Sequence, residues 1–138
     1  MTVSAFQASS RFQGLDYERQ VAARLAVDGW TILARNWHEP TTGTEIDIVA
    51  SDPDGKVWWI ECKGSIGSIT GTNGCRRSDT MKKAIADAWH LSTLADGEDY
   101  MLVTSHVPIC GGHPDRMLQA ALDAGIIATV LVMDWVTP

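Results

Sequence analysis

The sequence predicts an α/β fold formed by one domain. Helical and extended patterns follow one another as helix, three strands, helix, strand, helix and strand. The second and third strands are apolar on both faces, which is typical of central strands covered by helices. A chain of 138 residues is the length of a single domain and is long enough to bury a real core.

The composition is that of a soluble globular protein. Three cysteines without CxxC spacing favour free thiols in a reducing cytoplasm. No apolar run approaches the ~18 residues of a transmembrane helix, so no membrane association is expected. The N-terminus lacks the pattern of a secretion signal. The net charge of −6 argues against nucleic-acid binding by the whole surface, so such binding would require a local basic patch.

Residues 1–13 predict a loose leader, and residues 15–28 predict the first helix, which Gly29 ends. One stripe of this helix holds apolar residues at the helical spacing, and Glu18 falls on that stripe. Glu18 is either a stripe-edge residue, tied to Arg19 or to a backbone amide, or an acid with a function.

Residues 30–36 predict a first strand, followed by a loop at 37–43. The stretch 44–65 predicts two further strands joined by a tight turn. The Asp-Pro-Asp-Gly sequence at 52–55 indicates the turn, because Pro fixes φ and Gly permits a positive φ.

Alternation along these two strands places charged residues on shared faces. Glu45 and Asp47 share one face of the first strand, and Glu61 and Lys63 share one face of the second. An ordinary solvated sheet face with a cross-strand ion pair is one interpretation. The apolar surroundings favour another, in which a hard divalent cation gathers the carboxylates.

Residues 64–78 are rich in Gly, Ser and Thr and predict either a substrate-facing loop at the mouth of the site or an inert linker. Residues 79–95 predict a helix with Ser78 or Asp79 as N-cap. Its expected apolar face comprises Met81, Ala84, Ile85, Ala88, Trp89 and Leu91. The cluster Arg76, Arg77, Lys82 and Lys83 at its start is either a phosphate-binding surface or a solvated helix face.

The rest of the chain predicts a buried strand at 100–104, a helix at 114–124 and a last apolar strand at 126–135. A competing interpretation is a zinc site, whose four ligands would be Cys75, His106, Cys110 and His113. It lacks the closely spaced first ligand pair that is usual in structural zinc sites.

Ile46-Asp47, followed across a turn by Glu61-Cys62-Lys63, resembles the motif of the PD-(D/E)xK nuclease superfamily. The resemblance covers residues 14–104. It implies a restriction-endonuclease-like αβββαβ core with a central mixed sheet flanked by helices, to which this chain adds a C-terminal helix and strand.

The resemblance also implies chemistry. Asp47, Glu61 and the backbone carbonyl of Cys62 would bind Mg²⁺ or Mn²⁺, and Lys63 would orient or activate the attacking water or stabilise charge on the phosphate. Glu18 would add a further acidic group, as a metal ligand or a partner of water. Glu45 would be a ligand or would support one. The DNA contacts would come from Ser65 and from the basic cluster Arg76, Arg77, Lys82 and Lys83.

Glu18 on the first helix and the small size of the chain are similar to Holliday junction resolvases of the archaeal type. This similarity implies branched DNA as substrate, roles in DNA recombination and repair, and a homodimer that makes paired cuts. Gly64 departs from the Ser that often follows the lysine in those enzymes. The alternatives are a restriction- or repair-type nuclease that acts with a partner and a catalytically silent DNA-binding module.

Overall fold

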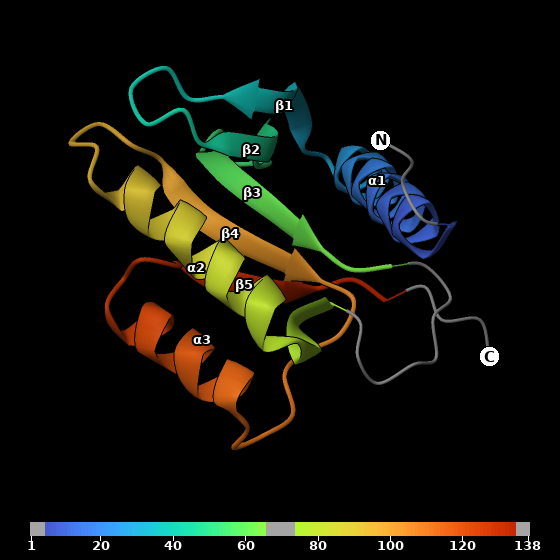
Figure 1. Cartoon of the computed structure of the whole chain (residues 1–138). Helices are drawn as coiled ribbons and strands as arrows, with labels where there is room; N and C mark the ends of the chain where they lie inside the picture. The colour runs from blue at the N-terminus through green and yellow to red at the C-terminus, as the bar shows by residue number, and fades with distance from the viewer. Residues whose placement is uncertain (1–4, 66–73, 135–138) are drawn as a thin grey trace.

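The computed structural model describes residues 5–65 and 74–134 of the chain (Figure 1). Its α-helices are α1 (Ala5–Val27), α2 (Ser78–Ser92) and α3 (His113–Asp123), with a short 3₁₀ helix, η1 (Gly74–Arg76), before α2. Its strands are β1 (Thr31–His38), β2 (Glu45–Ser51), β3 (Val57–Lys63), β4 (Asp99–Thr104) and β5 (Thr129–Val132). The predicted order of helices and strands is confirmed.

The strands form one five-stranded mixed sheet in the order β1-β2-β3-β4-β5. β1, β2 and β3 pair antiparallel, whereas β3–β4 and β4–β5 pair parallel. The parallel pairings require crossover connections, which α2 and α3 supply. The predicted central position of β2 and β3 is therefore confirmed, and the fold is the expected α/β arrangement.

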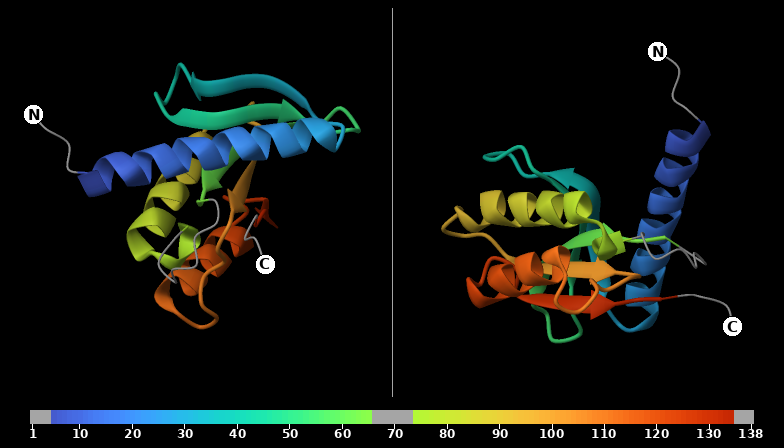
Figure 2. Two further views of the ribbon diagram at one scale, coloured as in Figure 1. Left: turned by 90° about the vertical axis from the view of Figure 1, so that its right-hand side faces the viewer. Right: turned by 60° about the horizontal axis from the view of Figure 1, so that its bottom comes forward.

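Helices cover the sheet on both faces (Figures 1 and 2). Tyr17, Val21 and Leu25 of α1 pack against one face, in a cluster that includes Ile48 and Ile60. The helices α2 and α3 pack against the other face, in a cluster that includes neighbouring strand residues such as Trp59 and Leu102. Successive strand residues therefore enter different cores, which explains why β2 and β3 are apolar on both faces.

The β2–β3 turn forms as its sequence predicts. Gly55 has a φ of +90°, and its N–H donates to the carbonyl of Asp52 at 2.9 Å. The Asp52 carboxylate accepts the N–H of Asp54 and of Lys56, each at 2.9 Å, and the indole N–H of Trp58 at 3.1 Å. This side chain therefore closes the turn and joins it to the start of β3.

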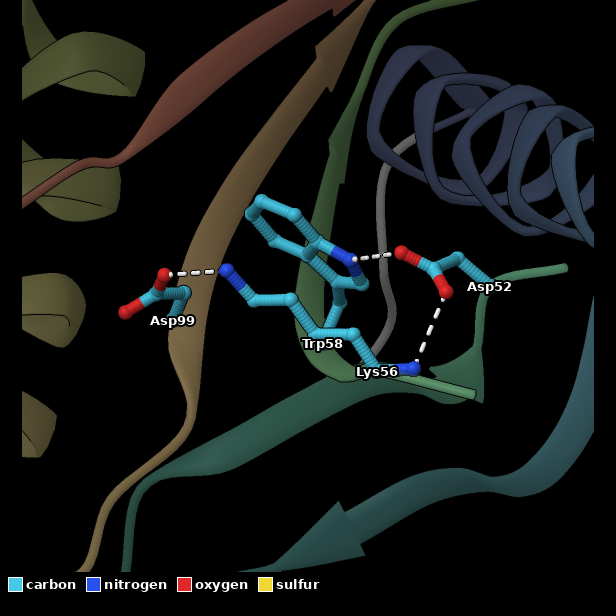
Figure 3. Close-up of polar contacts among 4 residues, drawn as sticks. All are labelled: Asp52, Lys56, Trp58 and Asp99. Carbon is cyan, nitrogen blue, oxygen red and sulfur yellow. Dashed lines mark hydrogen bonds and ion pairs between the residues drawn. The ribbon is translucent and has the colours of Figure 1, made fainter. Parts of the chain in front are cut away.

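Lys56 extends this arrangement to β4 through a cation–π contact with Trp58 and an ion pair with Asp99 (Figure 3). The Lys56 Nζ lies 4.2 Å from the centre of the Trp58 ring and 2.7 Å from Asp99 Oδ2. The contacts fix the end of the sheet at which β3 begins, so the residues near the end of β3 project from a braced strand.

The first helix is longer than predicted. It begins at Ala5, so the loose leader expected at 1–13 is wrong for residues 5–13, while residues 1–4 lie outside the described chain. Once a helix has formed, each added residue contributes one more hydrogen bond, and no proline interrupts this segment. No helix in the described residues is long and apolar enough to cross a bilayer.

Other boundaries also differ from the predictions. The α2 N-cap is Arg77, which makes no side-chain cap hydrogen bond, so Ser78 and Asp79 were wrong choices. Trp89 was expected on the buried face but is 53% exposed. β5 is shorter than 126–135 because the N–H groups of Ile126 and Ile127 bond to the end of α3.

We expect Asp52→Ala to lower the melting temperature near pH 7, because two backbone N–H groups and one indole N–H lose their acceptor. The hydrogen bond from Trp58 holds the pKa of Asp52 below its usual range. The stabilisation from its charged form is therefore present above its unfolded-state pKa and is lost as pH falls through the folded-state pKa.

Thermal unfolding followed by circular dichroism, with Asp54→Ala as a neighbouring control, measures this effect. Equal melting temperatures for the two variants near pH 7 would contradict the role assigned to Asp52.

Candidate active site

The candidate site forms where β2 and β3 separate. Their pairing ends at Ile48 and Ile60, so the next opposed positions are Asp47 and Glu61. The N–H of Cys62 donates to Asp47 Oδ2 at 2.9 Å, which directs the carboxylate toward β3. The predicted proximity of Asp47 to the Glu61-Cys62-Lys63 strand is therefore present in the structure.

A cleft of about 720 Å³ opens at this separation. Its walls come from α1, β1, the β1–β2 loop, β2, β3 and α2. The lining residues are Glu18, Asn36, Thr42, Gly43, Thr44, Glu45, Asp47, Glu61, Cys62, Lys63, Lys83 and Asp87. The sequence-predicted acids and lysine of the motif thus share one cleft.

Lys63 and Glu61 form an ion pair inside the cleft. The Lys63 Nζ lies 2.7 Å from Glu61 Oε1, and the side chains are only 16% and 5% exposed. Burial alone would lower the pKa of Lys63, but the charge and hydrogen bond of Glu61, together with Asp47, outweigh it and raise the pKa. Lys63 is therefore protonated at neutral pH, as expected for a lysine beside carboxylates.

The acids of the cleft bind protons more tightly than ordinary carboxyls. Burial, followed by the neighbouring charge of Asp47, raises the pKa of Glu61 to about 7. Burial and nearby acids, opposed by the Cys62 N–H and by Lys63, raise the pKa of Asp47 to about 6. Burial also raises the pKa of Glu18. Negative charge therefore accumulates in this cleft at a cost in free energy.

Glu18 lies on the buried stripe of α1, as predicted, and is 6% exposed. Its Oε1 is 3.2 Å from Arg35 Nη2 on β1, so it is tied neither to Arg19, which pairs with Asp16, nor to a backbone amide in the described chain. Glu45 lies at the rim with a side chain that is 48% exposed.

The predicted DNA-contacting residues are placed differently from one another. Lys83 lines the cleft, and Arg76, Arg77 and Lys82 are exposed at or before the first turns of α2. Arg77 is paired with Asp79 at 2.9 Å. Ser65 is 7% exposed, and its N–H donates to Ser105 Oγ at 3.1 Å, so it packs within the protein. Most of the expected substrate-facing loop, residues 66–73, lies outside the described residues.

Gly64 is required by close packing. A Cβ at this position would lie 2.4 Å from Ser105 Oγ and 2.9 Å from Tyr17 Cε1. A serine at this position, as often follows the lysine in resolvases, would therefore require those neighbours to move. The departure from that motif has a local steric cause.

The alternative zinc site is not formed. Within residues 5–65 and 74–134, no three or more His, Cys, Asp or Glu side chains are grouped so that they could hold a metal ion. This finding includes Cys75, His106, Cys110 and His113. It also applies to the acids of the cleft, which do not form a ready three-carboxylate cage.

Sequence reasoning missed several residues at the cleft. Asn36 and Asp87 line it, and Thr42 borders it within a loop organised by the buried carboxylate of Glu39. Glu39 accepts the N–H groups of Thr41 and Thr42 at 2.9 and 2.6 Å. The spacing of Lys83 and Asp87 on one helix face was visible in the sequence, but the proximity of that face to β3 was not.

The mixed sheet and the position of Asp47, Glu61 and Lys63 at the separation of two strands place the protein in the restriction-endonuclease-like PD-(D/E)xK superfamily. A family model described as "Uncharacterised protein family UPF0102" matches residues 17–91, which is more than half of the chain. The chain belongs to this family.

Relatives of the same family agree with this assignment. A UPF0102 protein from Paracidovorax citrulli is 28% identical over 130 residues, which cover 88% of this chain and 90% of the relative. A second, from Bifidobacterium longum subsp. infantis, is 46% identical over 46 residues, which cover 33% of this chain and 36% of the relative.

Two solved structures match most of this chain, and the one with the higher TM-score is similar in fold. The structure of an EndoMS–dsDNA2 complex has a TM-score of 0.52 at 15% identity, with 88% of this chain and 46% of that chain covered. A repair endonuclease from Pyrococcus abyssi has a TM-score of 0.48 at 14% identity, with coverages of 97% and 48%. The chain thus spans about half the length of each of these proteins.

We expect Asp47→Asn to raise the free energy of unfolding in metal-free buffer at pH 7.5 by roughly 1–3 kcal/mol. The pKa of Asp47 is raised in the folded state, from 3.8 to about 6, so its ionised form destabilises the fold at neutral pH. An Asn oxygen can still accept the Cys62 N–H.

Urea unfolding in the presence of EDTA measures the change. The difference from the wild type should grow as pH rises from about 4 to about 6 and should vanish below the unfolded-state pKa of Asp47. Asp54→Asn, at the exposed turn, controls for the loss of one negative charge. A variant that is less stable than the wild type at pH 7.5 would contradict this account of the cleft.

Proposed function

We propose that the protein is a divalent-metal-dependent endonuclease that hydrolyses DNA phosphodiester bonds. The observation that supports this proposal most directly is the cleft in which Asp47 and Glu61 face each other across separating strands, with Lys63 paired to Glu61. Two acidic groups and a lysine in one cleft are the arrangement that the resemblance to the PD-(D/E)xK motif implies.

The chemistry of the donor set fits Mg²⁺ or Mn²⁺. Asp47, Glu61 and the carbonyl of Cys62 offer hard oxygen ligands on adjoining strands, and Mg²⁺ commonly uses one or two carboxylates and completes its shell with water. Burial, and after it the neighbouring acids, raise the pKa values of Asp47 and Glu61, so the ionised carboxylates are costly here without a counter-charge. When bound, a cation would neutralise that charge, polarise the scissile phosphate and assist ionisation of water.

The protein residues would divide the remaining work. Lys63, protonated and held by Glu61, would stabilise charge that develops on the phosphate and orient the attacking water. Glu18 faces the same cleft from α1 and would accept a hydrogen bond from water there. Glu45 at the rim would support this group.

The path for DNA would pass over the start of α2. Lys83 lines the cleft, and the exposed Arg76, Arg77 and Lys82 lie toward the same end of the helix. These cations offset locally the net charge of −6 and suit the phosphate backbone. The similarity in fold to a complex with double-stranded DNA is compatible with this choice of substrate.

The substrate proposed first is branched DNA, cut in the manner of a Holliday junction resolvase by a homodimer. A chain of this size has little surface with which to read a long sequence, whereas a two-fold dimer can recognise a junction and make paired cuts. A restriction- or repair-type nuclease that acts on duplex DNA with a partner is the alternative, and a silent DNA-binding module is the third.

We expect Lys63→Ala to reduce Mg²⁺-dependent DNA cleavage by roughly 100-fold or more while DNA binding persists, because Lys63 acts on the reacting phosphate. Lys56→Ala is a matched control: it also removes one lysine charge, but roughly 23 Å away at the opposite end of β3. Its lysine contacts Trp58 and Asp99, outside the cleft.

The assay compares four-way junction, flap, single-stranded and linear duplex DNA in Mg²⁺, Mn²⁺ or EDTA. Symmetric nicks in the junction indicate a resolvase, cleavage of duplex DNA indicates the repair or restriction alternative, and binding without cleavage indicates the silent module. Normal cleavage by Lys63→Ala, or cleavage that survives EDTA, would refute the proposed mechanism.

A further inference from the structure

Asn36 has an unusual backbone conformation at the wall of the cleft. It lies in β1 between Arg35 and Trp37, which pair with Ile48 and Ile46, so it is opposite Asp47 in the register. Its φ is +51°, and among the described residues it is the non-glycine residue with positive φ. Such a conformation costs free energy and often occurs at functional sites.

The Asn36 side chain joins two acids that come from different elements. With its amide nitrogen toward the cleft, it donates to Glu18 Oε1 of α1 at 3.0 Å and to Glu45 Oε1 of β2 at 3.1 Å. This orientation is assigned from the hydrogen bonding, because the reverse one sets the amide oxygen against those carboxylate oxygens.

Glu18 is therefore held from one side by two adjacent residues of β1. Arg35 Nη2 lies 3.2 Å from the same Oε1 atom that accepts the Asn36 amide. Glu18 is nearly buried, and the neighbouring cation on its own helix, Arg19, pairs with Asp16 instead. Its direction in the cleft thus depends on β1.

We propose that Asn36 is a positioning residue, which bridges Glu18 and Glu45 and so fixes the direction of the Glu18 carboxylate in the cleft that Asp47 and Glu61 also line. The expected effect on DNA cleavage rests on the proposed nuclease function, whereas the hydrogen bonds of Asn36 to Glu18 and Glu45 do not. In this role Asn36 would act through the orientation of Glu18 rather than by contact with the scissile phosphate or the cation. Loss of the bridge should slow the chemical step more than it weakens substrate binding.

A purely structural explanation exists and makes a different prediction. Asn tolerates positive φ better than most residues, so it could occupy this position for its backbone alone. Glycine tolerates the conformation better still. Asn36→Gly therefore removes the bridging amide while it preserves the backbone, and it separates the two explanations.

We expect Asn36→Gly to lower kcat for DNA cleavage by roughly 10- to 100-fold, with KM changed less than about twofold. Asn36→Asp should lower kcat further, because it places a third carboxylate against Glu18 and Glu45. When Glu45→Gln is added to Asn36→Asp, the new amide at position 45 can donate to the new carboxylate at position 36. This double variant should therefore recover part of the lost kcat. A kcat for Asn36→Gly equal to that of the wild type would overturn the proposal.

A second measurement does not require cleavage. In EDTA, the melting temperatures of Asn36→Gly, Glu18→Ala and the double variant form a thermodynamic cycle for the full chain. If the bridge exists, the shift of the double variant should differ from the sum of the single shifts by about 2 °C or more. Additive shifts would overturn the proposed contact. Non-additive shifts in a protein that cleaves no DNA would refute the proposed function and leave the bridge supported.

Discussion

The site depends on the separation of two paired strands at a fixed position. β2 and β3 pair up to Ile48 and Ile60, and the next two opposed residues carry carboxylates. Buried acids at this separation repel one another, and the Cys62 N–H and Lys63 compensate only in part. The sheet tolerates this repulsion because both faces of β2 and β3 are packed into hydrophobic clusters. The stabilisation from burial of the two hydrophobic clusters therefore offsets the cost of burying these acids on neighbouring strands.

The rest of the fold brings further groups to that separation. The parallel pairing of β3 with β4 requires a crossover, and α2 lies in it, so Lys83 and Asp87 form the opposite wall of the cleft. The turn at Asp52 and the contacts of Lys56 brace the opposite end of β3. β3 is thus held in place at its start, far from the acids, and it lines the cleft at its end, where the acids lie. A rigid element that positions a polar site is a general requirement of catalysis.

Local patterns in the sequence predict most of this arrangement. The period of two placed Asp47, Glu61 and Lys63 correctly, and the helical period placed Glu18 on the packed stripe of α1, since both depend only on residues close in sequence. The role of Asn36 was not predictable in this way. Its significance comes from a backbone angle and from acids 18 residues before it and 9 residues after it, and no period connects the three. The burial of Ser65 was missed for the same reason, because its partner Ser105 lies on another strand connection.

The amide of Asn36 also bears on why so many acids can share one cleft. A cation between Glu18 and Glu45 would compete with the proposed divalent ion for ligands, whereas a neutral amide links the two without adding charge. Arg35, which is charged, bonds Glu18 from the β1 side. Lys63, which is largely buried, pairs with Glu61, and its charge also acts on Asp47. The donors from β1 therefore hold Glu18 and Glu45 in fixed directions. Lys63 offsets part of the charge of Asp47 and Glu61, and a divalent ion would neutralise the rest.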